Sequence, residues 1–407
     1  MHGRLMPGVK SLEVTVKEMM NMIPGLKLLA GENGVCRKVV GVMFMDVPEG
    51  DHWVRKNEVA VSAGYIFKDN QKLLNELIVK LNNKGASAFI IKTSSYLHTL
   101  SSEALETADE LGFPIIDIPQ EYHWADVSTT IIKKIIFHEI EIKQRNLLVS
   151  NLLNNLVKDT DELNMQARSL GWNFENGIAA IVVEQDITRK PGQKNERVFE
   201  DISAAAIMTF TENFQNPAYL VLEDQIVFLI SPKNDNYDEF REYLKNECTR
   251  LCHFINKTIH ATVSIGVGSI KLTPTNASIS FHEAQQAIKL SRILHKGGDY
   301  VFFEELGIYY LLFQLKDTQE AATFCDSYLG KLLKYDKENY TDLTNVLITI
   351  SRNDWNLSRA ASHLFMHYNT VKNKYYKIKS ILGIADNDHN SKFNIDVALR
   401  LLELMSY

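Results

Sequence analysis

The sequence is poor in cysteine and contains no long apolar run. Four cysteines occur in 407 residues, and their scatter does not resemble the paired framework of secreted domains. No stretch approaches the ~18 to 20 consecutive apolar residues of a membrane-spanning helix, and residues 1–10 lack the apolar core of a signal peptide. We therefore expect a cytoplasmic protein that has reduced thiols and no membrane partner.

The composition is otherwise ordinary for a globular protein, with 45% hydrophobic and 23% charged residues. A chain of this length can form roughly two to four domains. Because the formal net charge is −6, a basic segment stands out against an acidic average.

The first part of the chain alternates predicted strands and helices. The expected strands are residues 39–47, 58–67, 86–92 and 113–119, and the expected helices are residues 71–85 and 101–112. Ser101 or Ser102 is suited to cap the second helix, and Gly112 is suited to end it. This alternation predicts an α/β domain with an at least partly parallel sheet, in which pockets open at the carboxyl ends of the strands.

A long helix is predicted next, over residues 124–158, which contain no proline or glycine. Its apolar residues recur at near-helical spacing, although the heptads are irregular. They include Ile131, Ile135, Ile142, Leu148, Leu152 and Leu156. The pattern fits a pairing helix between domains, and it also fits a helix packed on its own domain.

A second α/β block is predicted over residues 177–316. Its expected strands are residues 177–183, 218–231 and 260–270, and an amphipathic helix over residues 280–298 follows them. The central strand should fold as a hairpin about Glu223 and Asp224. Helices dominate after Tyr309.

Residues 356–383 carry the strongest functional pattern. Asn356 and Ser358 are suited to cap a helix, and the alanine pair 360–361 is small enough to let two helices cross closely. A short turn at residues 365–367 separates this helix from a second one. The pattern is typical of a helix-turn-helix unit.

The second helix, predicted from about Asn369, has one apolar and one polar face. The residues expected to face inward are Val371, Tyr375, Ile378 and Leu382. Residues 351–383 have an excess of five positive charges, and lysines at such a face can displace counterions from a DNA backbone. The predicted DNA-contacting residues are Arg359, His367, Tyr368, Asn369, Thr370, Lys372, Asn373, Lys374, Tyr376 and Lys377. A helical hairpin with a solvated basic face is the alternative.

The segment NLSRAASHLFMHYNTVKNKYYKIKSILG, residues 356–383, resembles the C-terminal helix-turn-helix of PucR-type bacterial regulators. The matching positions are Ala360-Ala361, Leu364, His367, Asn369-Thr370-Val371, Ile378 and Gly383. Tyr368 stands where the family pattern has arginine, and Asn373 and Tyr375 replace its tyrosine and leucine, so the family's base preference is not carried over.

The resemblance extends over most of the chain. Residues 15–67 are similar to that family's N-terminal sensory domain, and the block after Gly177 is similar to its degenerate GGDEF-like domain. The resemblance implies a cytoplasmic, ligand-responsive transcription factor, more often an activator, that governs catabolism of purines, amino acids or related nitrogen compounds. Its implied partners are double-stranded DNA, a purine-, ureide- or amino-acid-like effector, and a second copy of the chain or a higher homo-oligomer.

The middle block also raises an enzymatic alternative, a nucleotide-binding or cyclase-type protein. A GGDEF-class cyclase needs two glycines at the hairpin tip for close approach of the nucleotide and a carboxylate there for a divalent metal. The tip sequence VLEDQ has carboxylates but no glycines, and the string GGDY at residues 297–300 follows a helix instead. We therefore expect no enzyme activity and no cofactor.

The remaining signals are weaker. An effector pocket is predicted from Asp46, Glu49, Trp53, Glu58, Ser62 and Gly64 around a strand-loop-strand, although acidic loop residues are also commonly just solvated. Cys248 and Cys252 have histidines nearby, but they lack a second ligand pair and better fit a packed helix face than a zinc site. Gly266 and Gly268 lack the third glycine of a dinucleotide-binding loop.

The predicted fold class is α/β multidomain, with a GGDEF-like α+β middle domain and an all-α C-terminus. The expected parts are a sensory domain at residues 12–123, a linker and dimerisation helix at 124–160, the middle domain at 161–305, and helices at 306–407 that include the helix-turn-helix at 351–383.

Overall fold

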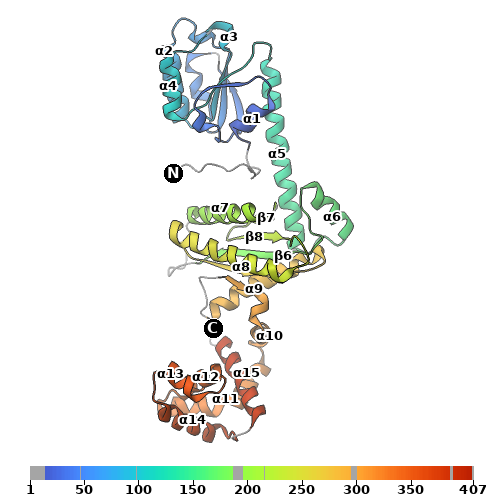
Figure 1. The fold of residues 1–407 in the computed structure, drawn as a ribbon, viewed down its shortest axis with the longest axis vertical. Coiled ribbons are helices and arrows are strands. Elements are labelled where there is room, and N and C mark those ends of the chain that lie inside the picture. The colour runs from blue at the N-terminus through green and yellow to red at the C-terminus, as the bar shows by residue number, and fades with distance from the viewer. Residues whose placement is uncertain are drawn as a thin grey trace. The chain divides into compact units, whose positions relative to one another are not determined.

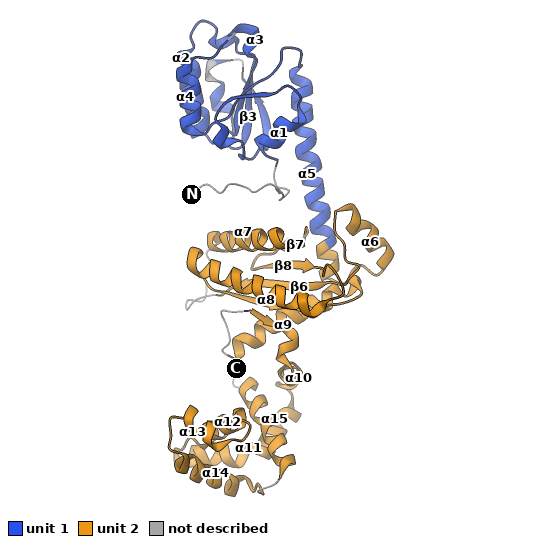
Figure 2. Cartoon of the chain, viewed as in Figure 1, with its two compact units in different colours: residues 1–148 blue, residues 149–407 orange. Residues whose placement is uncertain are grey.

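The computed structural model describes residues 14–45, 47–97, 99–186, 196–214, 216–294, 300–385 and 388–405, and of residues 48 and 49 only the backbone. The chain divides into two compact units, residues 1–148 and 149–407 (Figure 2). None of the helices in these ranges is both long enough and apolar enough to cross a membrane.

The first unit is built on a five-stranded sheet with the strand order β1-β5-β4-β3-β2 (Figure 1). The strands are β1 Lys27–Ala30, β2 Gly41–Phe44, β3 Glu58–Ser62, β4 Ala88–Ile91 and β5 Ile115–Asp117. Strands β2 to β5 run parallel, and β1 pairs antiparallel with β5. The prediction of a partly parallel sheet is confirmed.

Helices cover both faces of this sheet (Figure 1). Their bounds are α1 Val16–Met22, α2 Lys72–Asn83, α3 Thr93–Tyr96 and α4 Ser102–Leu111. Helices α2 and α4 pack on one face, and α1 packs on the other together with the start of α5, Trp124–Leu153. Because both faces of the sheet are buried, the central strands consist of continuous apolar residues.

Local chain signals set several of these ends. Ser101 caps α4 by accepting a hydrogen bond from the Ala104 amide at 3.3 Å, and Gly112 ends it with a left-handed backbone. The strand predicted over residues 58–67 stops at Ser62, because Gly64 is left-handed and starts a 3-10 turn. The predicted long helix ends at Leu153 rather than residue 158.

The second unit contains a five-stranded sheet of order β10-β9-β6-β8-β7. The strands are β6 Ala179–Gln185, β7 Ala218–Val221, β8 Gln225–Ile230, β9 Val263–Val267 and β10 Tyr300–Phe302. All neighbours are antiparallel except β9 and β10. Strands β7 and β8 form the expected hairpin about Glu223 and Asp224.

The helices around this sheet are α6 Thr160–Ser169, α7 Glu196–Asn213, α8 Tyr237–Phe254 and α9 Ala277–Ile293 (Figure 1). Helices α7 and α8 share one apolar cluster with the sheet, and Cys248 lies fully buried in that cluster. Burial raises the pKa of the Cys248 thiol well above its ordinary value, as expected for a packed cysteine. Residues 297–299 of the GGDY string lie outside the described residues.

Helix α9 packs unusually close to strand β9. A Cβ atom at Gly266 would lie 2.0 Å from the carbonyl oxygen of Ala284, and one at Gly268 would lie 2.0 Å from the carbonyl oxygen of Ser280. These glycines therefore serve helix-to-sheet packing rather than a dinucleotide loop.

Among the described residues, six helices complete the second unit, as the sequence predicts for the region after Tyr309. They are α10 Ile308–Leu315, α11 Gln319–Asn339, α12 Leu343–Arg352, α13 Leu357–His363, α14 Tyr368–Leu382 and α15 His389–Met405. Their apolar residues form one cluster that includes Leu329, Leu347 and Leu399. This cluster holds α13 and α14 in place.

Candidate nucleic-acid interface

Helix α13 begins at a side-chain cap and ends at a tight turn. The Asn356 carboxamide oxygen accepts hydrogen bonds from the amides of Ser358 and Arg359, at 3.0 and 3.1 Å. Ala360 and Ala361 are buried, which lets α13 pack closely against its neighbours. The cap is Asn356 alone, and Ser358 lies inside the helix.

The turn into α14 uses a left-handed residue. Phe365 has φ +52°, and its amide donates to the Ser362 carbonyl at 3.3 Å. His367 then caps α14, because its Nδ1 accepts from the Asn369 amide at 3.3 Å. At the other end, Gly383 is left-handed and stops the helix. The helix starts one residue before the predicted Asn369.

Helix α14 has the two faces that the sequence predicts. Val371 and Ile378 are fully buried, and the half-buried Tyr375 ring lies 6.3 Å from the Trp355 ring. The predicted DNA-contacting residues that are exposed are Arg359, His367, Tyr368, Asn369, Thr370, Asn373, Tyr376 and Lys377, and Lys372 and Lys374 are half-buried. The described parts of the second unit therefore leave this polar face open.

The positive charge on this face is smaller than the sequence suggests. Arg352 forms an ion pair with Glu403 of α15 at 2.5 Å, and Arg359 lies 3.7 Å from Asp354. Lys379 is only 9% exposed. The excess of five charges already counts Asp354, so what reduces it further is the pairing of Arg352 with the distant Glu403 and the burial of Lys379. The lysines left for a partner are Lys372, Lys374 and Lys377.

Aromatic rings hold two of these lysines. The Lys372 ammonium lies 6.0 Å from the centre of the Tyr368 ring and 5.9 Å from that of Tyr376. The Lys377 ammonium lies 5.2 Å from the Tyr335 ring of α11. Such cation–π contacts restrict the lysines without neutralising them. Sequence reasoning missed Tyr335, since only the packing of α11 on α14 brings it here.

Asp336 fixes the corner that leads into the helix-turn-helix. Its carboxylate accepts hydrogen bonds from the amides of Leu343 and Thr344, at 2.9 and 2.8 Å, and from the hydroxyls of Thr341 and Thr344, both at 2.6 Å. Burial alone would raise the pKa of Asp336, but these hydrogen bonds outweigh it and lower the pKa below its ordinary value. Asp336 of α11 therefore caps the first turn of α12.

We expect Asp336→Ala to lower the free energy of unfolding by about 1–2 kcal/mol at pH 7, the usual cost of losing a cap. A lowered pKa in the folded state contributes stability above the unfolded value of about 4, and this contribution is lost as the pH falls through the folded value. The difference from wild type should therefore shrink below about pH 4. Thermal unfolding followed by circular dichroism at several pH values measures both effects.

Asp342→Ala is the matched control. Asp342 occupies the nominal cap position of α12 but makes no capping hydrogen bond with its side chain. If its replacement costs as much stability as that of Asp336, the assignment of the cap is wrong.

Part of the predicted effector site lies outside what the structure describes. This holds for Asp46 and for the side chain of Glu49. Trp53 ends a 3-10 turn, and its side chain is largely exposed.

Of the other three predicted residues, only Ser62 and Gly64 lie together. Glu58 begins β3 and accepts a hydrogen bond from the Arg55 amide at 2.8 Å, whereas Ser62 ends the same strand. At ~3.3 Å per residue the two lie about 13 Å apart, at opposite edges of the sheet. The buried Ser62 hydroxyl accepts from the Gly64 amide at 3.0 Å, so only this pair is placed at the carboxyl edge.

Residues that the sequence analysis did not single out share that carboxyl edge. Asp117 at the end of β5 accepts hydrogen bonds from the amide and hydroxyl of Thr93, at 3.0 and 2.8 Å. Lys92, just after β4, donates to the Tyr122 carbonyl at 2.5 Å and lies 4.8 Å from the Trp124 ring. Strand order, not sequence proximity, brings these groups to one edge.

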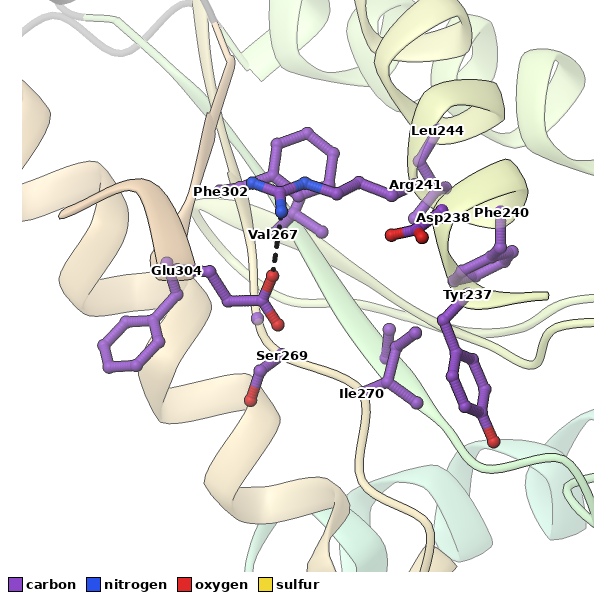
Figure 3. A pocket seen from close by; sticks show the side chains of 13 residues that line it. Tyr237, Asp238, Phe240, Arg241, Leu244, Val267, Ser269, Ile270, Phe302 and Glu304 are labelled. Carbon is purple, nitrogen blue, oxygen red and sulfur yellow. Dashed lines mark ion pairs between the residues drawn. The ribbon is translucent and has the colours of Figure 1, made fainter. Parts of the chain in front are cut away.

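The middle domain holds a cavity of about 200 Å³ between α8, β9 and β10 (Figure 3). Arg241 and Glu304 form an ion pair of 3.2 Å at its wall. The cavity touches Ala179 at the start of β6, whereas the β7–β8 hairpin tip lies beside Glu184 at its end. The cavity and the acidic tip are therefore at opposite ends of β6.

The architecture defines a class of multidomain helix-turn-helix protein, and comparison with known proteins identifies the family. Residues 15–135 match the purine catabolism regulatory protein-like family, residues 155–290 match the GGDEF-like domain, and residues 343–401 match the PucR C-terminal helix-turn-helix domain. The chain belongs to the PucR family.

Curated relatives agree with this assignment. The Purine catabolism regulatory protein of Bacillus subtilis is 35% identical over 27% of this chain and 20% of its own length. The DNA-binding transcriptional activator AdeR of Bacillus subtilis is 25% identical over 56% of this chain and 53% of its own, and the Proline-responsive transcriptional activator PutR of Bacillus subtilis is 24% identical over 45% of each. The matches thus span about half of these relatives or less.

Proposed function

We propose that this chain is a cytoplasmic transcriptional activator that binds duplex DNA through α13 and α14 and responds to a small metabolite. The observation that carries the proposal is the open polar face of α14, with Asn369 and Thr370 in its first turn and Lys372 and Lys377 further along the helix. In helix-turn-helix proteins, the first residues of the second helix contact base edges in the major groove. Lysines on the same face of the helix would contact phosphates.

The metabolite is proposed to be a purine, a ureide or an amino acid. The names of the relatives support this class, since one refers to purine catabolism and another to a response to proline. We place the effector at the carboxyl edge of the first sheet, near Ser62 and Gly64, because parallel sheets bind ligands at that edge. Thermal-shift measurements with these compounds test the choice, since a ligand stabilises the fold that binds it.

Self-association is proposed to run along α5. Ile132, Ile136, Ile140 and Leu147 recur at four-, four- and seven-residue intervals on one side of the helix and are 44–62% exposed. A single helix-turn-helix buries little DNA surface, so two copies that read two half-sites would provide useful affinity. Effector binding would then bias the placement of the two DNA-binding units. Light scattering of the full chain tests the dimer.

A mobility-shift assay on the duplex fragment upstream of its own gene tests DNA binding. We expect a sequence preference over an unrelated fragment of equal length. The logarithm of the binding constant should fall linearly with the logarithm of salt concentration, at about −0.9 per neutralised phosphate. Lys372, Lys374 and Lys377 predict a slope of roughly −2 to −3 for each bound unit. Equal binding of both fragments at every salt concentration would contradict the proposal.

The rival function is a nucleotide cyclase that uses the middle domain. The exposed hairpin tip with Glu223 and Asp224 lacks the glycines that admit a nucleotide, and it lies across the sheet from the cavity in Figure 3. Incubation with magnesium and nucleoside triphosphates distinguishes the two functions. Turnover would favour the rival.

A further inference from the structure

Phe365 combines two unfavourable features in the turn between α13 and α14. Its side chain is 97% exposed, and its backbone is left-handed with φ +52°. Bulky residues rarely occupy this backbone region, because Cβ approaches the neighbouring carbonyl oxygen. Exposed phenylalanine also leaves apolar surface in water.

The fold of the turn does not require a phenylalanine side chain. The Phe365 amide donates to the Ser362 carbonyl at 3.3 Å, and the Met366 amide donates to the Ala361 carbonyl at 3.0 Å. This pair of hydrogen bonds defines a Schellman motif, whose left-handed position is usually glycine. Glycine would form the same backbone bonds without the conformational cost.

Exposure and a left-handed backbone alone do not identify a contact residue. Tyr340, at the end of α11, is also 97% exposed and also has φ +52°. The two residues differ in their position relative to the helix-turn-helix. Phe365 lies two residues before the capping His367 and four before Asn369, in the exposed turn that leads directly into the open face of α14. In docked helix-turn-helix units the start of the second helix enters the major groove, which places this turn at the edge of the groove.

Resting on the proposed DNA-binding function, we propose that Phe365 is a DNA contact residue. Its ring packs against apolar carbons at the edge of the major groove, either a thymine C5-methyl group or deoxyribose carbons. Contact with DNA removes the exposed ring from water. This gain explains why a residue that disfavours the turn occupies it.

Phe365→Gly in the full chain separates binding from stability. We expect the midpoint of thermal unfolding to stay the same or rise by about 2–4 °C, since the left-handed backbone is relaxed. We expect affinity for the upstream fragment to fall about tenfold. Tyr340→Gly is the matched control, because it relaxes the same backbone strain and removes an equally exposed ring. It should leave the affinity unchanged.

A fragment prepared with uracil in place of thymine distinguishes the two sources of apolar carbon. If a thymine methyl is the contact, wild type loses affinity for this fragment and Phe365→Gly does not. If deoxyribose is the contact, uracil has no effect on either protein, while Phe365→Gly still binds more weakly.

The inference is overturned if Phe365→Gly binds the upstream fragment as tightly as Tyr340→Gly. It is also overturned if Phe365→Gly weakens binding only by unfolding the domain, which the melting curves reveal. Failure of the wild-type chain to bind any duplex would instead reject the proposed function itself.

Discussion

A chain carrying both Asn369→Ala and Lys372→Ala should bind its upstream duplex on the order of 100-fold more weakly than wild type at fixed salt. Asn369 is positioned in the first turn of α14 to contact a base edge, which is commonly worth ~1–3 kcal/mol. Lys372 is positioned between two tyrosine rings to contact a phosphate. The loss of one base contact and one phosphate contact together gives the expected decrease in affinity of about 100-fold. Mobility shift or fluorescence anisotropy measures it.

The two single variants should behave differently. Lys372→Ala should weaken binding to all duplexes alike and make the salt slope shallower by about one. Asn369→Ala should reduce the preference for the upstream fragment over unrelated DNA.

Lys289→Ala is the control for this prediction. Lys289 is an exposed lysine on α9 in the middle domain, so its removal changes net charge equally without touching the face of α14. Its affinity should match wild type. Unchanged binding by the double variant would show that α14 is not the DNA-binding element.

Gly266→Ala should lower the free energy of unfolding of the middle domain by about 3 kcal/mol or more. The added Cβ would lie 2.0 Å from the Ala284 carbonyl oxygen, which is backbone and cannot rotate away. Helix α9 would have to move off β9 to relieve the overlap. Calorimetry or urea unfolding of the full chain measures the loss.

Gly330→Ala adds the same methyl group with the opposite expected result. Its Cβ would lie 2.3 Å from Oδ1 of Asp326, the free end of a side chain that can rotate. Because alanine favours a helix interior over glycine, this change should stabilise α11 by about 0.5–1 kcal/mol. If both variants shift stability in the same direction, close packing of α9 is not the reason for Gly266.

Features that depend on neighbouring residues were predictable from the sequence. The caps at Ser101 and Asn356 and the stops at Gly112 and Gly383 involve groups within about one helical turn, so their spacing is visible in the chain. The two faces of α14 follow in the same way from helical periodicity.

Features that depend on distant residues were not predictable. Strand β1 has only four residues, and its partner β5 lies near the other end of the first unit in sequence. The pattern of those four residues could not predict this pairing. The predicted effector residues remain a prediction, although Glu58 and Ser62 lie at opposite ends of one strand.

The sequence by itself indicated the family, through its motifs. It also determined the strongly periodic helices and strands and the polar face of α14, because these rest on local capping and periodicity. Tertiary structure alone decided how much positive charge that face presents. Glu403 neutralises Arg352, and packing buries Lys379. The strength of an ion pair and the burial of a side chain depend on distances in space. These distances are set only when the helices pack together.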